Sequence, residues 1–236
     1  MSDALSSLIE AAAQAMVAER CRQSYLHDLR GDLQALNSSV ELLVRAASAA
    51  APNAALAEKA AGLARKTLLH HEQSLAEILE TMAPGIERES RIDLGDLAAS
   101  AVKLLRGEAS RHSVDLQAKV MRGAAIVTRA RLCRSIINGL SVFCIDALPP
   151  GASLTVGASR MDAWAVIEWR ASAALPATRI PAAEDCLPDG DSAFQVLVAA
   201  TRRWVSAAGG RLVLPSQAPP GAENALTILY PAFSEP

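Results

Sequence analysis

The chain has few of the residues that mark several common protein classes. Aromatic residues make up only 3% of its 236 positions, which disfavours an all-β sandwich, because aromatic side chains are enriched in strands. No stretch approaches the roughly 18 uncharged apolar residues of a membrane-spanning helix. The formal net charge is −2, so the sequence provides no electrostatic basis for binding nucleic acid or a membrane surface.

Cysteine is also scarce, and its spacing differs from that of the common metal and redox motifs. The four cysteines lack the Cys-x-x-Cys pattern of zinc and thiol–disulfide sites: Cys21, Cys133, Cys144 and Cys186. We therefore expect reduced thiols, a cytoplasmic location, and no resident metal or cofactor. The N-terminal sequence MSDALSSLIEAAAQ lacks the basic start of a secretory signal. Hydrophobic residues, many of them alanine, make up 51% of the chain and predict a helix-rich protein with a packed core.

Proline is absent from the first part of the chain, and this absence predicts a long helix. Residues 3–50 contain no proline and a single glycine, Gly31, which would interrupt the helix only locally. Apolar residues in this stretch recur at alternating intervals of three and four, as in the seam of a coiled coil or four-helix bundle: Leu26, Leu29, Leu33, Leu36, Val40 and Leu43.

A second helix is predicted after Pro52, ending at the Met-Ala-Pro-Gly sequence of residues 82–85. Two long helices with a short connection form an antiparallel hairpin, which we assign to residues 1–85. A single hairpin would leave much of its leucine-rich seam uncovered. We therefore predict that two chains associate through both helices as a homodimeric four-helix bundle.

Residues 86–236 have the mixed pattern of an α/β sandwich, so the whole chain is predicted to be of the α+β class. The expected sandwich is a mostly antiparallel sheet covered by about three helices. These helices are predicted from Leu94 to about Gly107, from Ala130 to Ala147, and from Ser192 to about Ala208. The predicted strands cover 91–93, 114–116, 125–127, 153–159, 164–172, 211–215 and 225–230.

His27 is the residue whose surroundings best fit a chemical role. On a helix with the leucine seam inside, His27 projects from a polar face that continues through Arg30, Gln34 and Ser38. An accessible neutral imidazole beside a carboxylate, here Asp28, suits a phosphoryl acceptor, because the carboxylate can hold the other ring N–H. Periodicity alone favours a solvated surface histidine over a phosphoryl acceptor.

The sequence around His27 resembles the phosphoacceptor box of sensor histidine kinases, in which His-Asp/Glu-Leu-Arg opens the first helix of the dimerisation and phosphotransfer hairpin. The matching segment is YLHDLRGDLQALNSSVELL. Later segments resemble the ATP-binding domain of the same kinases in the same order. They are RIDLGDLAASAVKLL, SVDLQAKV, RLCRSIINGLSVFCIDALPPGASLTV, VAATRRWVSAAGGRLVLP and ALTILYP. The resemblance extends from about residue 20 to residue 231.

The sequence departs from these kinases where they bind nucleotide. Their asparagine box has two asparagines four residues apart, the later of which holds magnesium; here Asn138 fills the first position and Val142 the second. Their Asp-x-Gly-x-Gly stretch, which binds adenine, has no counterpart, because no glycine occurs between Gly157 and Gly190. Their later glycine-rich lid is replaced by GDSAFQVLVAA. Glycine permits close backbone approach to phosphate, so we expect no ATP binding.

A complete phosphoacceptor box joined to such a body resembles the dimeric histidine phosphotransferases of phosphorelays. The resemblance implies that His27 accepts a phosphoryl group from one receiver aspartate and passes it to another, while Asp28 orients or polarises the imidazole. It implies receiver contacts for Arg22, Arg30 and Gln34, although a solvated surface is an equal alternative for the two arginines. The partners would be response-regulator receivers and the receiver of a hybrid histidine kinase, which would supply the magnesium.

Two other functions compete with this interpretation. The chain could be a non-catalytic pseudokinase adaptor that binds response regulators or a kinase, which the box around His27 disfavours. It could also be an atypical ATP-dependent sensor histidine kinase, which the missing asparagine and glycines disfavour. Of the remaining histidines, His71 lies near the seam and is expected to be packed or hydrogen-bonded. His70 and His112 receive no function.

Overall fold

The chain folds into two compact units, each of which is described here by itself. The structure, a computed structural model, describes residues 3–48, 53–82, 88–121, 123–175, 193–215 and 224–233. The hairpin unit is Cys21–Ala83, and the α/β unit joins Met1–Arg20 to Pro84–Pro236. The first twenty residues thus group with the α/β unit, whereas the sequence placed them in the hairpin. Their buried side chains include Ala13 and Val17.

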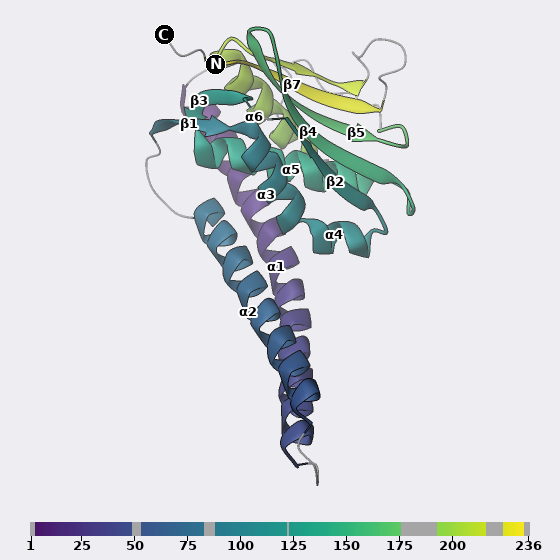
Figure 1. Cartoon of the computed structure of the whole chain (residues 1–236). Coiled ribbons are helices and arrows are strands. Elements are labelled where there is room, and N and C mark those ends of the chain that lie inside the picture. The colour runs from purple at the N-terminus through teal and green to yellow at the C-terminus, as the bar shows by residue number, and fades with distance from the viewer. Residues whose placement is uncertain are drawn as a thin grey trace. The chain divides into compact units, whose positions relative to one another are not determined.

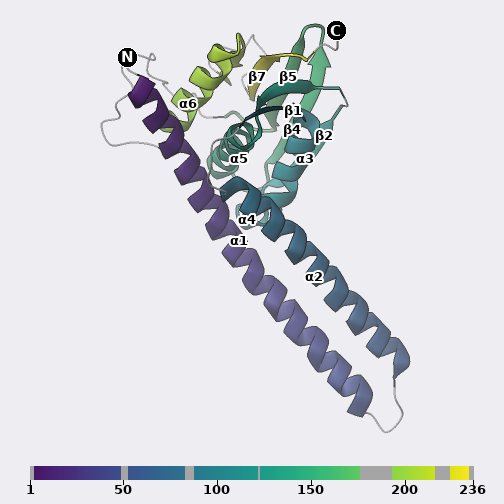
Figure 2. The ribbon, with the colours of Figure 1, turned by 90° about the vertical axis from the view of Figure 1, so that its left-hand side faces the viewer.

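The hairpin unit consists of the later part of α1 (Asp3–Ser48) and of α2 (Ala54–Met82), which run antiparallel (Figure 2). Both helices agree closely with the ranges predicted from the proline positions. Asn53 begins α2 as its N-cap, because its side-chain Oδ1 accepts a hydrogen bond from the backbone N–H of Leu56 at 3.0 Å.

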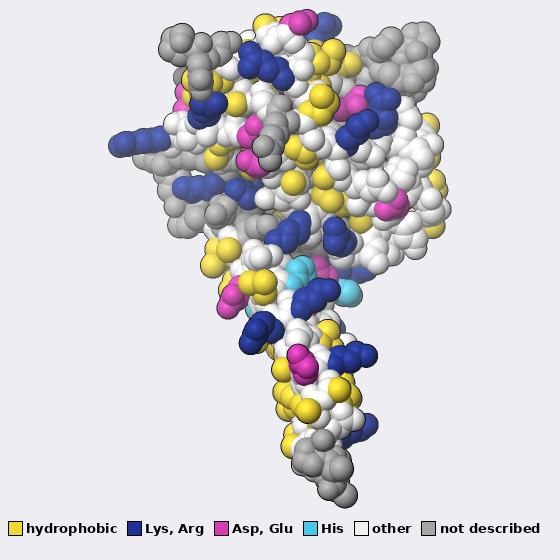
Figure 3. Space-filling view, in the orientation of Figure 1, with side chains coloured by type: hydrophobic (Ala, Val, Ile, Leu, Met, Phe, Trp, Pro, Cys, Tyr) yellow, Lys and Arg dark blue, Asp and Glu magenta, His cyan; other side chains and the backbone are white. Residues whose placement is uncertain are grey.

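The most deeply buried positions of this hairpin carry small or polar side chains rather than leucine. Their spacing is that of a heptad pattern, with seven residues from Ser39 to Ala46 on α1 and seven from Ala60 to Thr67 on α2. The leucine-rich seam predicted on α1 is only partly covered: Leu29, Leu36 and Leu43 are half-buried, and its other residues are exposed. Leu33 is 57% exposed and Val40 54%, and hydrophobic side chains are visible along the hairpin in Figure 3. The exposed apolar residues of the hairpin are Leu26, Leu33, Val40, Val44, Leu63, Leu68, Leu69, Leu75 and Leu79.

The α/β unit contains a five-stranded sheet with the strand order β2-β4-β5-β7-β6 and a separate two-stranded β1-β3 ribbon. The strands are β1 (Glu89–Asp93), β2 (Asp115–Val120), β3 (Ala125–Arg129), β4 (Ser153–Met161), β5 (Trp164–Ala171), β6 (Arg211–Val213) and β7 (Ala225–Pro231). The sheet was predicted to be mostly antiparallel, and three of its four pairings are. The exception is β2, which runs parallel to β4. Parallel neighbours need a long crossover connection, usually a helix, and the connection from β2 to β4 includes α5.

Helices cover one face of this sheet (Figure 1). They are α3 (Leu94–Leu104), the short α4 (Arg106–Arg111), α5 (Ala130–Ala147) and α6 (Ala193–Ala207). Helix α3 contacts β2 and β4, α6 contacts β6 and β7, and α5 contacts both α3 and α6. The helix predicted over 94–107 is therefore two helices, and α5 has the predicted bounds.

Two buried tryptophans connect the layers of the α/β unit. The indole Nε1–H of Trp169 on β5 donates to Ser141 Oγ on α5 at 2.8 Å, and that of Trp204 on α6 donates to Thr128 Oγ1 on β3 at 2.8 Å. Both side chains bury a large apolar surface while their polar atoms keep a partner. These contacts hold α5 against the sheet and α6 against the two-stranded ribbon.

Two glycines are expected to respond oppositely to substitution by alanine. A Cβ at Gly31 would meet no atom within 4 Å, so Gly31→Ala should stabilise the hairpin by about 1 kcal/mol through helix propensity. A Cβ at Gly210 would lie 2.7 Å from Val205 Cγ1 and 3.1 Å from Val205 O, so Gly210→Ala should destabilise the α/β unit by about 1–3 kcal/mol.

The two effects can be measured separately, because all three tryptophans of the chain, Trp164, Trp169 and Trp204, belong to the α/β unit. Urea titrations should therefore follow Gly210→Ala by tryptophan fluorescence and Gly31→Ala by far-ultraviolet circular dichroism. Equal midpoints for wild type and Gly210→Ala would contradict the packing described at this position.

Candidate functional site

His27 lies on the exposed surface of α1 in the hairpin unit. Its side chain is 62% exposed, and its Nδ1 lies 3.4 Å from Oδ1 of Asp28. A carboxylate only accepts hydrogen bonds, so in a neutral ring this contact favours the tautomer with the proton on Nδ1. The lone pair of Nε2 is then available to an electrophile arriving from solvent.

The surroundings of His27 on α1 are open. Arg30 and Gln34 follow His27 by three and seven residues, so they share its helix face, and both are exposed. Gly31 lies between them and has no side chain. A Cβ added at this position would have no atom within 4 Å. Arg22 precedes His27 by five residues and therefore lies about 140° around the helix from it. Of the three predicted receiver contacts, the helix groups Arg30 and Gln34 with His27 and separates Arg22 from them.

A second histidine, His71 on α2, forms a cluster with two residues of α1. Its Nε2 lies 3.2 Å from Tyr25 Oη, and its ring stacks on that of Tyr25 with centroids 5.6 Å apart. Its Nδ1 lies 3.8 Å from Oδ2 of Asp32. Burial and the nearby charge of Asp32 raise the pKa of Tyr25, which keeps the phenol protonated. The prediction that His71 is hydrogen-bonded agrees with these contacts. Tyr25 and Asp32 were missed, although their spacing of seven residues could have indicated a shared face.

The positions that the family resemblance assigns to nucleotide binding are packed inside the α/β unit. Asn138 is 2% exposed and Val142 is 8% exposed, both on α5. Between them, a Cβ at Gly139 would lie 2.6 Å from Val17 Cγ2 and 2.9 Å from Leu197 Cδ2. Side chains of α1 and α6 therefore occupy the space beside this part of α5. The glycine-poor stretch within 176–192, and Cys186 in it, lie outside the described residues.

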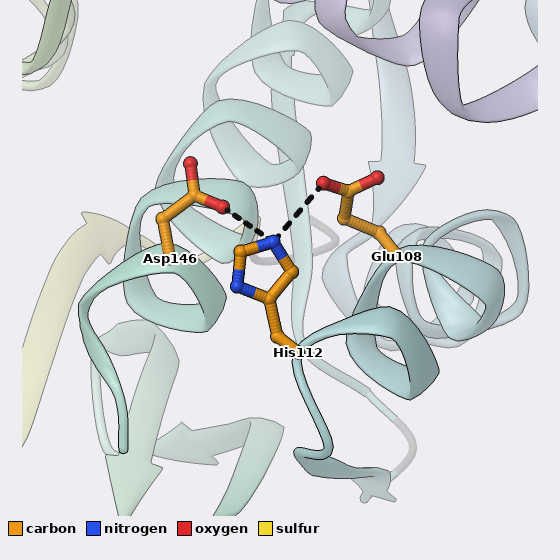
Figure 4. A group of neighbouring side chains, drawn as sticks. All are labelled: Glu108, His112 and Asp146. Atoms are coloured by element: carbon orange, nitrogen blue, oxygen red, sulfur yellow. Dashed lines mark ion pairs between the residues drawn. The ribbon is translucent and has the colours of Figure 1, made fainter. Parts of the chain in front are cut away.

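A further cluster of ionisable side chains joins three helices of the α/β unit (Figure 4). The Nε2 of His112 lies 3.3 Å from Asp146 Oδ1 and 3.6 Å from Glu108 Oε1. These ligand atoms could in principle surround a cation. However, Arg20 contacts both oxygens of Asp146 at 2.9 and 3.0 Å and Glu108 Oε1 at 3.1 Å, while Arg111 pairs with Glu108 Oε2. Two guanidinium groups balance the two carboxylates, so we assign the cluster to the packing of α1, α4 and α5.

The described cysteines are buried and form no disulfide with one another: Cys21, Cys133 and Cys144. Burial raises the pKa of the Cys144 thiol to about 12, so it stays protonated and unreactive at neutral pH. Within the part of the chain that the structure describes, no helix combines the length and apolarity needed to cross a bilayer.

Comparison with known proteins relates the chain to histidine kinases through its fold. No family model and no curated protein matches it. The catalytic domain of histidine kinase ThkA has a TM-score of 0.50 at 10% sequence identity, covering 61% of this chain and 96% of that one. The Acinetobacter baumannii histidine kinase AdeS covers 88% of this chain and 98% of its own at 13% identity, with a TM-score of 0.48. A bacterial phosphotransferase covers 97% of both chains at 16% identity, with a TM-score of 0.45.

At these identities the similarity concerns the fold alone. It agrees with the predicted α+β class, in which an N-terminal helical hairpin accompanies a mixed sheet with helices on one face. The chain therefore has a histidine-kinase-like body, with the fold of a histidine-kinase catalytic domain.

Proposed function

We propose that the chain is a phosphorelay histidine phosphotransferase, which passes a phosphoryl group between receiver aspartates through His27 without using ATP. The observation that carries this proposal is the exposed His27 paired through Nδ1 with Asp28, on a helical hairpin attached to a histidine-kinase-like body. The accessible Nε2 and the open helix face around Gly31 leave room for a receiver to approach.

The proposed transfer requires only groups that His27, Asp28 and a receiver provide. Nε2 of His27 attacks the phosphorus of a receiver aspartyl phosphate; an N–P bond forms as the O–P bond breaks, and the receiver carboxylate leaves. Asp28 accepts the Nδ1–H throughout and stabilises the positive charge that develops on the ring. No proton has to leave the imidazole. The reverse step delivers the phosphoryl group to a second receiver, and magnesium bound by each receiver offsets the charge of the phosphoryl oxygens.

The exposed leucines of the hairpin support the homodimer that we propose as the active assembly. The most deeply buried positions between the helices of one chain are small or polar, and many large apolar side chains stay exposed. Exposed apolar side chains in such number indicate an interaction surface. A second copy of the hairpin would cover it with the same residues, because a two-fold interface pairs identical patches.

The α/β unit is expected not to bind Mg-ATP. Val142 offers no magnesium ligand, Asn138 is buried, and Val17 and Leu197 fill the space beside Gly139. Titration calorimetry with Mg-ATP should show no binding heat under conditions in which an active histidine-kinase catalytic domain does. Micromolar binding, or labelling of the chain from radioactive ATP, would instead favour an ATP-dependent kinase.

The phosphotransferase proposal is tested by following label from phosphorylated receivers onto the chain. Purified receiver domains from the same organism are phosphorylated on their aspartates and mixed with the full chain. We expect at least one receiver to label wild type at His27, and a second receiver to remove the label. If receivers bind but never transfer label to the chain, the protein is a receiver-binding adaptor instead.

A further inference from the structure

The interior of the hairpin contains one cluster of large polar side chains among its small residues. His71 of α2 contacts Tyr25 through Nε2 and approaches Asp32 through Nδ1, at 3.2 and 3.8 Å. Among the described residues, His71 Nδ1 is one of two buried side-chain atoms without a hydrogen-bond partner. A buried nitrogen without a hydrogen-bond partner costs stability, so packing alone does not explain the cluster.

His71 faces the same two residues of α1 whichever ring nitrogen carries a proton, but only Tyr25 is within hydrogen-bond distance. When the ring is neutral with its proton on Nδ1, Tyr25 Oη donates to Nε2 and the Nδ1–H faces the Asp32 carboxylate. When the ring is charged, Nε2–H donates to Tyr25 Oη, and Nδ1–H faces Asp32 as an ion pair. His71 therefore hydrogen-bonds to Tyr25 and lies beside Asp32, two residues of α1 that are two helical turns apart.

These two points flank the turn of α1 that carries His27. Asp28 follows Tyr25 by three residues and precedes Asp32 by four, so it lies on the same side of α1 as both. His27 lies about 200° around the helix from Tyr25. The rotation of α1 that brings Tyr25 and Asp32 to His71 is thus the rotation that exposes His27.

This turn has few other features that could fix its rotation. Gly31 lies within it, and glycine is the weakest helix former after proline. Of its apolar residues, Leu26 and Leu33 are exposed in the single chain, and Leu29 is only half-buried. The contacts of His71 with Tyr25 and Asp32 span this weak point from both sides.

We propose that Tyr25, His71 and Asp32 form a positioning cluster that fixes the rotation of α1 and so presents His27 to a receiver in the orientation needed for in-line transfer. This inference rests on the proposed phosphotransfer function. Polar residues in an otherwise uniform helical seam are known to specify register, and small misplacements of a reacting group reduce rates strongly.

The test compares a protein donor, which needs alignment, with a small donor, which does not. The small donor is phosphoramidate: its P–N bond breaks, ammonia leaves, and a new P–N bond forms to the imidazole. The variants are Tyr25→Phe, which keeps the ring, Asp32→Asn, His71→Leu and His71→Gln, whose amide oxygen can still accept from Tyr25. His70→Leu is the matched control, because His70 is the exposed neighbour of His71.

We expect Tyr25→Phe, Asp32→Asn and His71→Leu to lower transfer from a phosphorylated receiver about tenfold while changing labelling by phosphoramidate less than about twofold. His71→Gln should recover part of the loss, and His70→Leu should behave as wild type. Leucine fills the site with apolar volume and leaves no unsatisfied nitrogen, so His71→Leu should unfold no earlier than wild type. Receiver transfer at the wild-type rate in His71→Leu, or equal losses with both donors, would overturn the positioning role.

Hydrogen exchange separates failure of this inference from failure of the proposed function. In Tyr25→Phe and His71→Leu, the amides of residues 25–33 should exchange about fivefold faster, and those of residues 38–48 at the wild-type rate. If no receiver labels the wild-type chain, the phosphotransfer proposal is wrong, and this local change would still support the control of α1 by the cluster. If the amides of residues 25–33 exchange at the wild-type rate in both variants, the cluster does not fix the rotation of α1, irrespective of the result with receivers.

Discussion

His27→Ala should abolish acceptance of the phosphoryl group while leaving the fold intact. Among the described residues of the hairpin, His27 is the histidine whose side chain is both largely exposed and paired through Nδ1 with a carboxylate, that of Asp28. The side chain is largely exposed, so its removal should change the free energy of unfolding by no more than about 0.5 kcal/mol. The measurement is a time course of label from a phosphorylated receiver, with circular dichroism on the same samples.

Asp28→Asn should slow this transfer by about 10²–10³, the usual cost of removing one group that stabilises charge developing in the transition state. Asparagine keeps the shape of aspartate but loses the charge that stabilises the imidazole as it becomes positive. Receiver binding should change little, since the substitution leaves Arg30 and Gln34 in place. His70→Ala is the control and should retain full labelling. Label on the His27→Ala chain would show that another residue is the acceptor.

Placing aspartate at both Leu33 and Val40 should convert the protein from dimer to monomer. Both side chains are more than half exposed in the single chain, so the double substitution removes little buried surface within the hairpin. In a dimer, it would bury four carboxylates per interface, and each unpaired buried charge costs several kcal/mol. Leu36 is half-buried within the chain, which makes Val40 the better second position. Sedimentation velocity at micromolar concentration gives the assembly state directly.

The matched control for this experiment is Ser38→Asp, which adds the same charge at an exposed polar position of α1. It should sediment as wild type. A folded wild-type chain that sediments as a monomer, or a Leu33→Asp/Val40→Asp chain that remains dimeric, would exclude the leucine surface as the dimer interface.

The helices were predictable because their ends depend on local chemistry. Proline and glycine near residues 52 and 82–85 end regular structure whatever the tertiary context, and the predicted ends of α1, α2 and α5 lie within a few residues of the observed ones. The face of α1 that would close the hairpin was harder to predict. The leucine periodicity indicates an apolar stripe but not its partner, and α2 instead approaches through positions such as Ala60 and Thr67.

The candidate site was predictable only where its residues are neighbours in sequence. His27 and Asp28 are adjacent, so the sequence alone suggested their pairing, and the structure places them 3.4 Å apart. The contact of Tyr25 with His71 joins residues 46 positions apart, and that of Arg20 with Asp146 joins residues 126 apart. Such contacts depend on how whole elements pack, which no local pattern encodes.

The division of the chain has a consequence for the order in which it folds during synthesis. The hairpin is an insertion within the α/β unit, because Met1–Arg20 and Pro84–Pro236 lie on either side of it. The first twenty residues leave the ribosome early but must wait for α5 before Val17 can pack beside Gly139 and Arg20 can pair with Asp146. Closing this loop costs entropy that only late contacts repay, whereas the hairpin has all its residues as soon as α2 is complete. The hairpin can therefore form first on the nascent chain, before the α/β unit is complete.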